Sequence, residues 1–151
     1  MSYLAHMLKT LTGLLLRRPI VGACVIPVRP DGTIVLILRR DNHRWSLPGG
    51  LVDWGEDVIT AARRELREEA GIESAELDRL VGVYSKPGRD PRFHSICVAV
   101  AVRVPDQPYT ADPQEVLEVR SFARDALPWD QLAHDHRHQL EDFFQGKTVL
   151  A

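Results

Sequence analysis

The sequence predicts a single α/β (α+β) domain in which a mixed β-sheet lies between helices. Short segments rich in Val and Ile alternate with segments whose apolar residues recur at helical spacing. The chain has 151 residues, a length that suits one hydrophobic core better than two. A composition of 44% hydrophobic and 26% charged residues argues against disordered, collagen-like and coiled-coil proteins.

Residues 1–19 are predicted to form an amphipathic helical segment ahead of a domain over residues 20–145. Six apolar residues recur there at helical spacing: Leu4, Met7, Leu8, Leu11, Leu14 and Leu15. Pro19 disfavours continuation of the helix. We expect this helix to pack on the domain or on a second subunit, so a homodimer is an open alternative. A membrane-surface role is the other, because basic residues flank the apolar face.

The β-strands are predicted from runs of β-branched residues. Residues 20–28 and 33–39 form a predicted hairpin, because the turn sequence Arg29-Pro30-Asp31-Gly32 separates them. A short extended piece runs to Asp53, and further strands are expected over residues 80–85, 95–104 and 116–122.

Two further helices are predicted. One covers residues 57–70 and is closed by Gly71, since glycine commonly follows the last helical residue. The other covers residues 128–144, with four apolar anchors: Leu132, Leu140, Phe143 and Phe144.

Charge and cysteine content narrow the partners and the location. A formal net charge of −2 provides no global basic field, which argues against nucleic acid as the main partner. Cys24 and Cys97 each lie in an apolar run and are predicted to be inert core residues. No apolar stretch reaches the ~20 residues of a membrane span. The N-terminal segment lacks the features of a signal peptide, so we expect a cytoplasmic protein.

The segment from Gly50 to Ile72, GLVDWGEDVITAARRELREEAGI, carries the chemistry. At about 100° per residue, one helix face gathers Ile59, Ala62, Leu66 and Ala70, and we expect that face to be buried. Three carboxylates fall within an arc of about 100° beside it: Glu65, Glu68 and Glu69.

Like charges at these spacings repel, and a cation would neutralise them. Carboxylates suit Mg²⁺ or Mn²⁺, which bridge protein carboxylates to phosphate oxygens. The alternative for RRELREE alone is a solvated, salt-bridged helix face. Pro48-Gly49-Gly50 favours a site, because glycine lets the backbone approach a ligand closely.

The whole segment resembles the Nudix box, whose pattern is G-x5-E-x7-R-E-U-x-E-E-x-G-U with U aliphatic. Every fixed position is filled: Gly50, Glu56, Arg64, Glu65, Leu66, Glu68, Glu69, Gly71 and Ile72. The resemblance implies a Nudix-like α/β/α sandwich and an enzyme, a Nudix hydrolase that cleaves a nucleoside diphosphate linked to another group.

The resemblance also implies residue roles. Glu65, Glu68 and Glu69 hold Mg²⁺ or Mn²⁺, the Gly49 carbonyl is a further ligand, and Arg64 orients the glutamates. Glu56 is implied to be structural, pairing with a basic side chain.

The base that deprotonates the attacking water is either a box glutamate or an acid from a later loop. Glu115 and Glu118 are the candidates in that loop. The alternative for Glu118 is an exposed charge on a strand, with no catalytic role.

The segment LVGVYSKPGRDPRFH suggests the substrate. Arg89 and Arg92 are suited to clamp phosphates, or else they pair with Asp90 in an ordered loop. With LPGGLVDWGE and Asp135-His136, this segment resembles the ADP-ribose pyrophosphatases of the Nudix family. That resemblance implies hydrolysis of ADP-ribose to AMP and ribose 5-phosphate.

Other substrate-binding candidates are weaker. Arg39 and Arg40 end a strand near the expected cleft. Trp45 and Tyr84 could stack on the base, although aromatic rings are more often buried in the core. His134 and His138 lie at helical spacing and could together bind zinc, but no third ligand stands at a supporting spacing. We therefore expect this region to form part of the last helix.

Two other functions compete. A nucleotide-pool sanitiser acting on nucleoside triphosphates would share every box residue and differ in the pocket. A non-catalytic nucleotide-sensing Nudix domain would have an eroded box and often an attached DNA-binding domain, whereas this box is intact.

Overall fold

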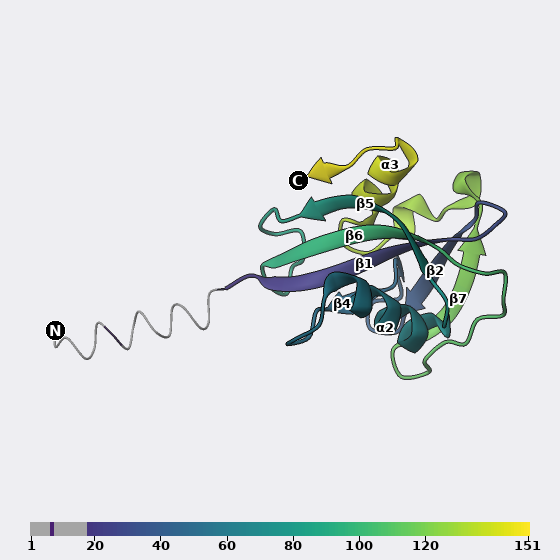
Figure 1. The fold of residues 1–151 in the computed structure, drawn as a ribbon, viewed down its shortest axis with the longest axis horizontal. Helices are drawn as coiled ribbons and strands as arrows, with labels where there is room; N and C mark the ends of the chain where they lie inside the picture. The colour runs from purple at the N-terminus through teal and green to yellow at the C-terminus, as the bar shows by residue number, and fades with distance from the viewer. Residues whose placement is uncertain (1–6, 8–17) are drawn as a thin grey trace.

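The computed structural model describes Met7 and residues 18–151. The predicted helical segment over residues 1–19 lies almost entirely outside these residues, so the domain boundaries stay a prediction. The described chain forms one eight-stranded mixed sheet with strand order β3-β2-β1-β6-β5-β8, and β4 and β7 pair with β1 and β2 (Figure 1). The strands are β1 (Ile20–Val28), β2 (Ile34–Arg39), β3 (Trp45–Ser46), β4 (Gly49–Leu51), β5 (Glu76–Tyr84), β6 (Ser95–Arg103), β7 (Val116–Phe122) and β8 (Val149–Leu150).

The predicted hairpin and the mixed sheet are both confirmed. β1 and β2 are antiparallel, with Val28 opposite Ile34, and Gly32 occupies the turn at φ 81°. β1 is parallel to β6 over its whole length, from Ile20 beside Ser95 onward. Pairing in both directions gives the mixed sheet.

β5 starts at Glu76, four residues before the predicted strand over residues 80–85. Its first half is mostly exposed and lies antiparallel to β6, with Leu77 opposite Val102. Register shifts interrupt the pairing twice in this half. Residues 76–79 therefore join the strand by pairing with β6. Their sequence lacks the alternation of apolar and polar residues that would predict a strand.

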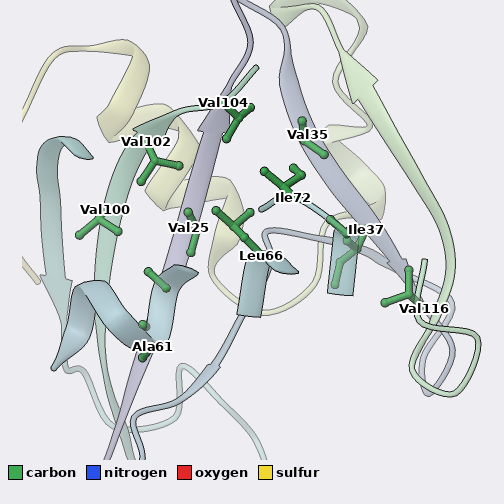
Figure 2. Packing of buried hydrophobic residues seen from close by; sticks show 13 residues of the cluster. Val25, Val35, Ile37, Ala61, Leu66, Ile72, Val100, Val102, Val104 and Val116 are labelled. Atoms are coloured by element: carbon green, nitrogen blue, oxygen red, sulfur yellow. The ribbon is translucent and has the colours of Figure 1, made fainter. Parts of the chain in front are cut away.

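Helix α2 (Val58–Ala70) confirms the predicted box helix. The Asp57 side chain accepts a hydrogen bond from the Thr60 N–H at 2.8 Å and caps the N-terminus, and Gly71 ends the helix at φ 66°. Three of the four predicted face residues, Ala62, Leu66 and Ala70, are fully buried, and Ile59 is partly buried. Figure 2 shows Leu66 among the valines of the sheet.

The two faces of the sheet carry separate cores. Along β2, Val35 and Ile37 belong to the cluster under α2, whereas Ile34 and Leu36 belong to the cluster that includes Leu140 of α3 (His136–Phe144). Because successive strand residues point to opposite faces, α2 and α3 cover opposite sides of the sheet (Figure 1). The predicted sandwich is confirmed.

The predicted helix over residues 128–144 is wrong in its first half. A 3-10 turn covers Trp129–Gln131, and the chain then extends, with the Ala133 N–H donating to the Trp45 carbonyl at 2.8 Å. His134 follows in the left-handed region at φ 51°. Pairing with the strand at Trp45 thus overrides the helical periodicity, and α3 starts only at His136. Of the predicted anchors, Leu132 and Leu140 are buried, and Phe143 and Phe144 are partly buried.

Candidate active site

The diglycine of β4 lies against both β1 and α2. A Cβ on Gly49 would stand 2.3 Å from the Ala23 carbonyl oxygen, and one on Gly50 would stand 2.3 Å from Oε1 of Glu65. Any larger residue would displace the neighbouring strand or the carboxylate. The sequence predicts that these glycines let the backbone approach a ligand closely. In the structure they also let it approach the side chain of Glu65.

Glu69 is the most confined carboxylate of the box. It is only 5% exposed, and its Oε2 accepts a hydrogen bond from the Gly49 N–H at 2.9 Å. Burial, with smaller contributions from Glu65 and Glu115, raises the pKa of Glu69 to about 8. A negative charge is costly here unless a cation compensates for it.

Arg64 connects the loop before α2 with the acidic side of the helix. Its Nε and Nη2 donate to the two carboxylate oxygens of Glu56, both at 3.0 Å, which confirms the predicted pairing of Glu56 with a basic side chain. Its Nη1 donates to Glu65 at 2.7 Å and to Glu68 at 3.3 Å. Arg64 thus contacts both glutamates that the resemblance implies it orients.

The three box carboxylates lie along one side of α2, but their side chains point to different partners. Arg64 holds Glu65 and Glu68, while Glu69 faces the diglycine. Among residues 18–151, no group of three or more His, Cys, Asp or Glu side chains is arranged to hold a metal ion. The predicted convergence of the three carboxylates is therefore incomplete, because Arg64 bonds two of them and the third bonds Gly49.

The donor set nevertheless fits a hard divalent cation. Carboxylate and carbonyl oxygens are the ligands that Mg²⁺ and Mn²⁺ prefer. Burial raises the pKa of Glu65 as well as that of Glu69, so a cation would relieve a cost that the fold imposes on both. Glu68 is the most accessible of the three carboxylates, at 50% side-chain exposure.

Three predicted arginines, Arg39, Arg89 and Arg92, line a small cavity of about 90 Å³ together with the diglycine. Each is paired with an aspartate. Arg39 bonds Asp41 at 2.9 and 2.6 Å, and Arg92 bonds Asp90 at 3.0 and 2.8 Å.

Arg89 differs from the other two arginines because it is buried. It bonds Asp135 at 2.8 and 2.7 Å and Ser95 Oγ at 2.5 Å, with its side chain 8% exposed. Arg92 is 51% exposed. The structure therefore makes Arg92 more accessible to a ligand than Arg89.

The predicted stacking role of Trp45 and Tyr84 needs correction. Both side chains belong to the core under α3, at 6% and 3% exposure. The Trp45 ring packs edge-on against Phe122, and the Tyr84 hydroxyl donates to Asp142 at 3.0 Å. Neither ring presents a face to a base, since core packing uses both.

The two candidate loop bases lie in different surroundings. The carboxylate of Glu115 is close enough to Glu65 and Glu69 to raise the pKa of both. Its backbone carbonyl accepts a hydrogen bond from the Arg40 N–H at 2.9 Å, which fixes the loop to the end of β2. Glu118 lies on β7 and pairs with Arg120. Of the two, Glu115 is the one beside the acidic group.

His136, which entered the sequence analysis only through the resemblance carried by Asp135-His136, is a structural element of the site. Its Nδ1 accepts a hydrogen bond from the Leu47 N–H at 3.0 Å, so it secures the segment leading into the diglycine. Burial lowers the pKa of His136 to about 3, which keeps the ring neutral. His134 and His138 do not share a helix face, because α3 starts between them. The sequence pointed to this region through Asp135-His136 and the run of histidines, but not to the contact between His136 and Leu47.

The two cysteines line the same small cavity. Cys97 is buried as predicted, whereas Cys24 is half-buried, with its Sγ 3.6 Å from Nε2 of His136. Both are free thiols. Within the described residues, no helix combines the length and apolar character that a membrane crossing requires.

Comparison with known proteins places this arrangement in a family. A model of the NUDIX domain matches residues 18–143. The chain is 36% identical over 124 residues to an ADP-ribose pyrophosphatase of Methanocaldococcus jannaschii, covering 80% of this chain and 71% of that protein. It is 46% identical over 66 residues to a putative 8-oxo-dGTP diphosphatase of Bacillus subtilis, covering 44% of each. The crystal structure of an ADP-ribose pyrophosphatase from Streptococcus suis matches with a TM-score of 0.73 at 25% identity, over 89% of this chain and 100% of that one.

Proposed function

This chain belongs to the Nudix family and is a Nudix hydrolase, and from that premise we propose that it cleaves ADP-ribose to AMP and ribose 5-phosphate with the help of a divalent cation. The observation that carries the proposal is the cleft itself. The diglycine lines a small cavity together with Arg39 and Arg92, and the box carboxylate Glu69 is joined to the diglycine by the hydrogen bond from the Gly49 N–H. Such a cleft can hold a linked diphosphate between a cation site and guanidinium groups.

The proposed ligands of the cation are the carboxylates of Glu65, Glu68 and Glu69 and the carbonyl of Gly49. When bound, Mg²⁺ or Mn²⁺ would neutralise the buried negative charge, polarise a diphosphate oxygen and increase the acidity of a water molecule. Arg64 would keep Glu65 and Glu68 in place through its present contacts.

Glu115 is the proposed general base. It lies in the loop before β7, near enough to Glu65 and Glu69 to raise the pKa of both, and a base must lie within reach of the water whose proton it takes. Glu118 is less suited, because Arg120 already pairs with it. Arg92 and Arg39, which line the small cavity, would bind the non-bridging phosphate oxygens and hold the diphosphate for attack.

ADP-ribose is favoured over other nucleotides by the extent of the similarity. The relative named as an ADP-ribose pyrophosphatase matches over 80% of the chain, whereas the putative 8-oxo-dGTP diphosphatase matches over 44%. Because substrate choice in a shared fold depends on segments outside the catalytic motif, the longer match is the more informative one.

The test is an Mg²⁺-dependent hydrolysis screen over ADP-ribose, dinucleotides, nucleotide sugars and nucleoside triphosphates. The expected result is the highest kcat/KM for ADP-ribose, with AMP and ribose 5-phosphate as products. Preference for nucleoside triphosphates would instead support the nucleotide-pool sanitiser. Binding of ADP-ribose without turnover at any Mg²⁺ or Mn²⁺ concentration would support a nucleotide sensor. The cytoplasmic location and the homodimer stay predictions.

A further inference from the structure

Two cavities meet at one wall of the cleft. The small cavity beside the diglycine measures about 90 Å³, and a larger one of about 600 Å³ lies between the β5–β6 loop and α3. Arg89 and His134 line both. Pockets for drug-sized ligands measure roughly 300–1,000 Å³, so the small cavity alone is too small for a nucleotide-linked sugar.

His134 at this junction has two unusual properties. Its backbone lies in the left-handed region at φ 51°, a conformation that non-glycine residues rarely adopt and that often occurs at functional sites. Its Nε2 is buried and, within the described part of the chain, has no hydrogen-bond partner. Buried polar atoms are nearly always paired, so this nitrogen points to a missing partner.

The His134 ring is suited to a neutral partner. Burial is the main cause that lowers the pKa of His134 below its ordinary value, and Arg92 and Arg39 lower it further, while Asp90 and Asp135 oppose them. The ring is therefore neutral at pH 7. A neutral imidazole has one donor and one acceptor nitrogen, which suits a hydroxyl group.

The larger cavity has the lining of a sugar site. Side chains of both charges surround it, including Lys86, Lys147, Glu141 and Asp142, together with the amide of Gln145. Its one aromatic residue other than histidine, Tyr84, is buried to 3% exposure. Many hydrogen-bonding groups without an aromatic face favour a polyhydroxylated group over a nucleobase.

We propose that the larger cavity is the subsite for the sugar joined to the diphosphate, and that His134 Nε2 is the hydrogen-bond partner of one of its hydroxyl groups. This inference rests on the proposed function, since it assigns a place to the ribose that leaves as ribose 5-phosphate. His134 would then determine specificity for sugar-linked substrates.

The first test uses His134→Asn with His43→Asn as its matched control. Both histidines have a positive φ, 51° and 55°, which asparagine tolerates, and His43 is exposed and lies outside both cavities. Ribose 5-phosphate, AMP and inorganic phosphate are titrated into each protein in the presence of Mg²⁺. We expect His134→Asn to weaken ribose 5-phosphate about tenfold and to leave AMP and phosphate unchanged. His43→Asn should leave all three unchanged.

The second test blocks the larger cavity. His138 and Arg137 are neighbouring exposed positions on α3, and only His138 lines this cavity. His138→Trp should weaken ribose 5-phosphate about tenfold, whereas Arg137→Trp should not. Equal affinities in each variant and its control, or no binding of ribose 5-phosphate to the wild-type protein, would overturn the proposal.

These outcomes separate the two proposals. If the wild-type protein hydrolyses ADP-ribose but the variants match their controls, the sugar subsite is wrong and the proposed function stands. If ADP-ribose is not hydrolysed but ribose 5-phosphate binds in a His134-dependent way, the subsite stands and the proposed function is wrong.

Discussion

The two sides of the cleft are built in different ways. The acidic side comes from one continuous segment, residues 50–72, whose helix is capped at both ends by its own residues, Asp57 and Gly71. The opposite side is assembled from three distant segments, which contribute Arg39, Arg92 and His134. Under the proposed function, local geometry thus provides the groups for hydrolysis, whereas tertiary packing provides the groups for substrate choice. The family shares the first and can vary the second.

Changing the acidic side should have the largest effect on turnover. We expect Glu69→Gln to lower kcat by about 10³-fold, since it removes the most confined negative charge of the site. The amide can still accept from the Gly49 N–H, so the fold should persist. Steady-state kinetics with ADP-ribose and a far-ultraviolet circular dichroism spectrum check both points. Glu76→Gln, an exposed strand position paired with Arg103, is the control.

Changing Arg89 on the opposite side should affect stability. Arg89→Met leaves the carboxylate of Asp135 without its buried partner, and loss of one member of a buried pair costs about 3 kcal/mol. Arg92→Met, at the half-exposed pair, should cost less than about 1 kcal/mol. Urea unfolding of the two variants measures the difference. Equal losses would show that Arg89 is no more structural than Arg92.

Glu115 lies in the loop before β7 and Glu118 lies on β7, so the effects of their substitution on turnover can be compared directly. We expect Glu115→Gln to lower kcat about 10²-fold, because it removes the proposed base, and Glu118→Gln to change kcat less than about twofold. Steady-state kinetics with ADP-ribose measures kcat for both variants. Similar rates for both variants would exclude Glu115 as the base.

The buried His136 should make the free energy of unfolding depend on pH, with a smaller effect than the substitutions above. Its pKa in the folded protein, about 3, lies below its ordinary value of about 6.5, so the unfolded chain binds the extra proton between these values. Stability is therefore lost as the pH falls below 6.5. The His136 contribution should amount to about 1 kcal/mol between pH 7.5 and 5.5.

This effect is measured by thermal or urea unfolding at both pH values. His136→Gln should lose about 1 kcal/mol less than the wild-type protein over this pH interval. His43→Gln, at an exposed histidine, should behave like the wild-type protein. The same pH dependence in all three proteins would contradict the assignment.

The sequence allowed α2 to be predicted almost to the residue, because its caps, its apolar periodicity and its acidic pattern are all local. The beginnings of β5 and α3 were missed, since pairing with β6 and with Trp45 sets them. Partners distant in the chain cannot be read from spacing. Neither the pairing of Arg89 with Asp135 nor the bond from the Leu47 N–H to His136 could therefore be predicted.

The aromatic candidates illustrate the same limit. Trp45 and Tyr84 have the chemistry to stack on a base, and only the packing of β3 and β5 under α3 shows that the core uses them. The convergence of Glu65, Glu68 and Glu69 follows from helical spacing, but spacing does not reveal that Arg64 holds two of them.

Mn²⁺ binding, followed by electron paramagnetic resonance, tests the division between the two sides most directly. The wild-type protein and His134→Asn should bind Mn²⁺ with the same affinity, and Glu69→Gln should bind it at least tenfold more weakly. Wild-type affinity in Glu69→Gln, or no Mn²⁺ binding by the wild-type protein, would contradict the assignment of the acidic side to the cation.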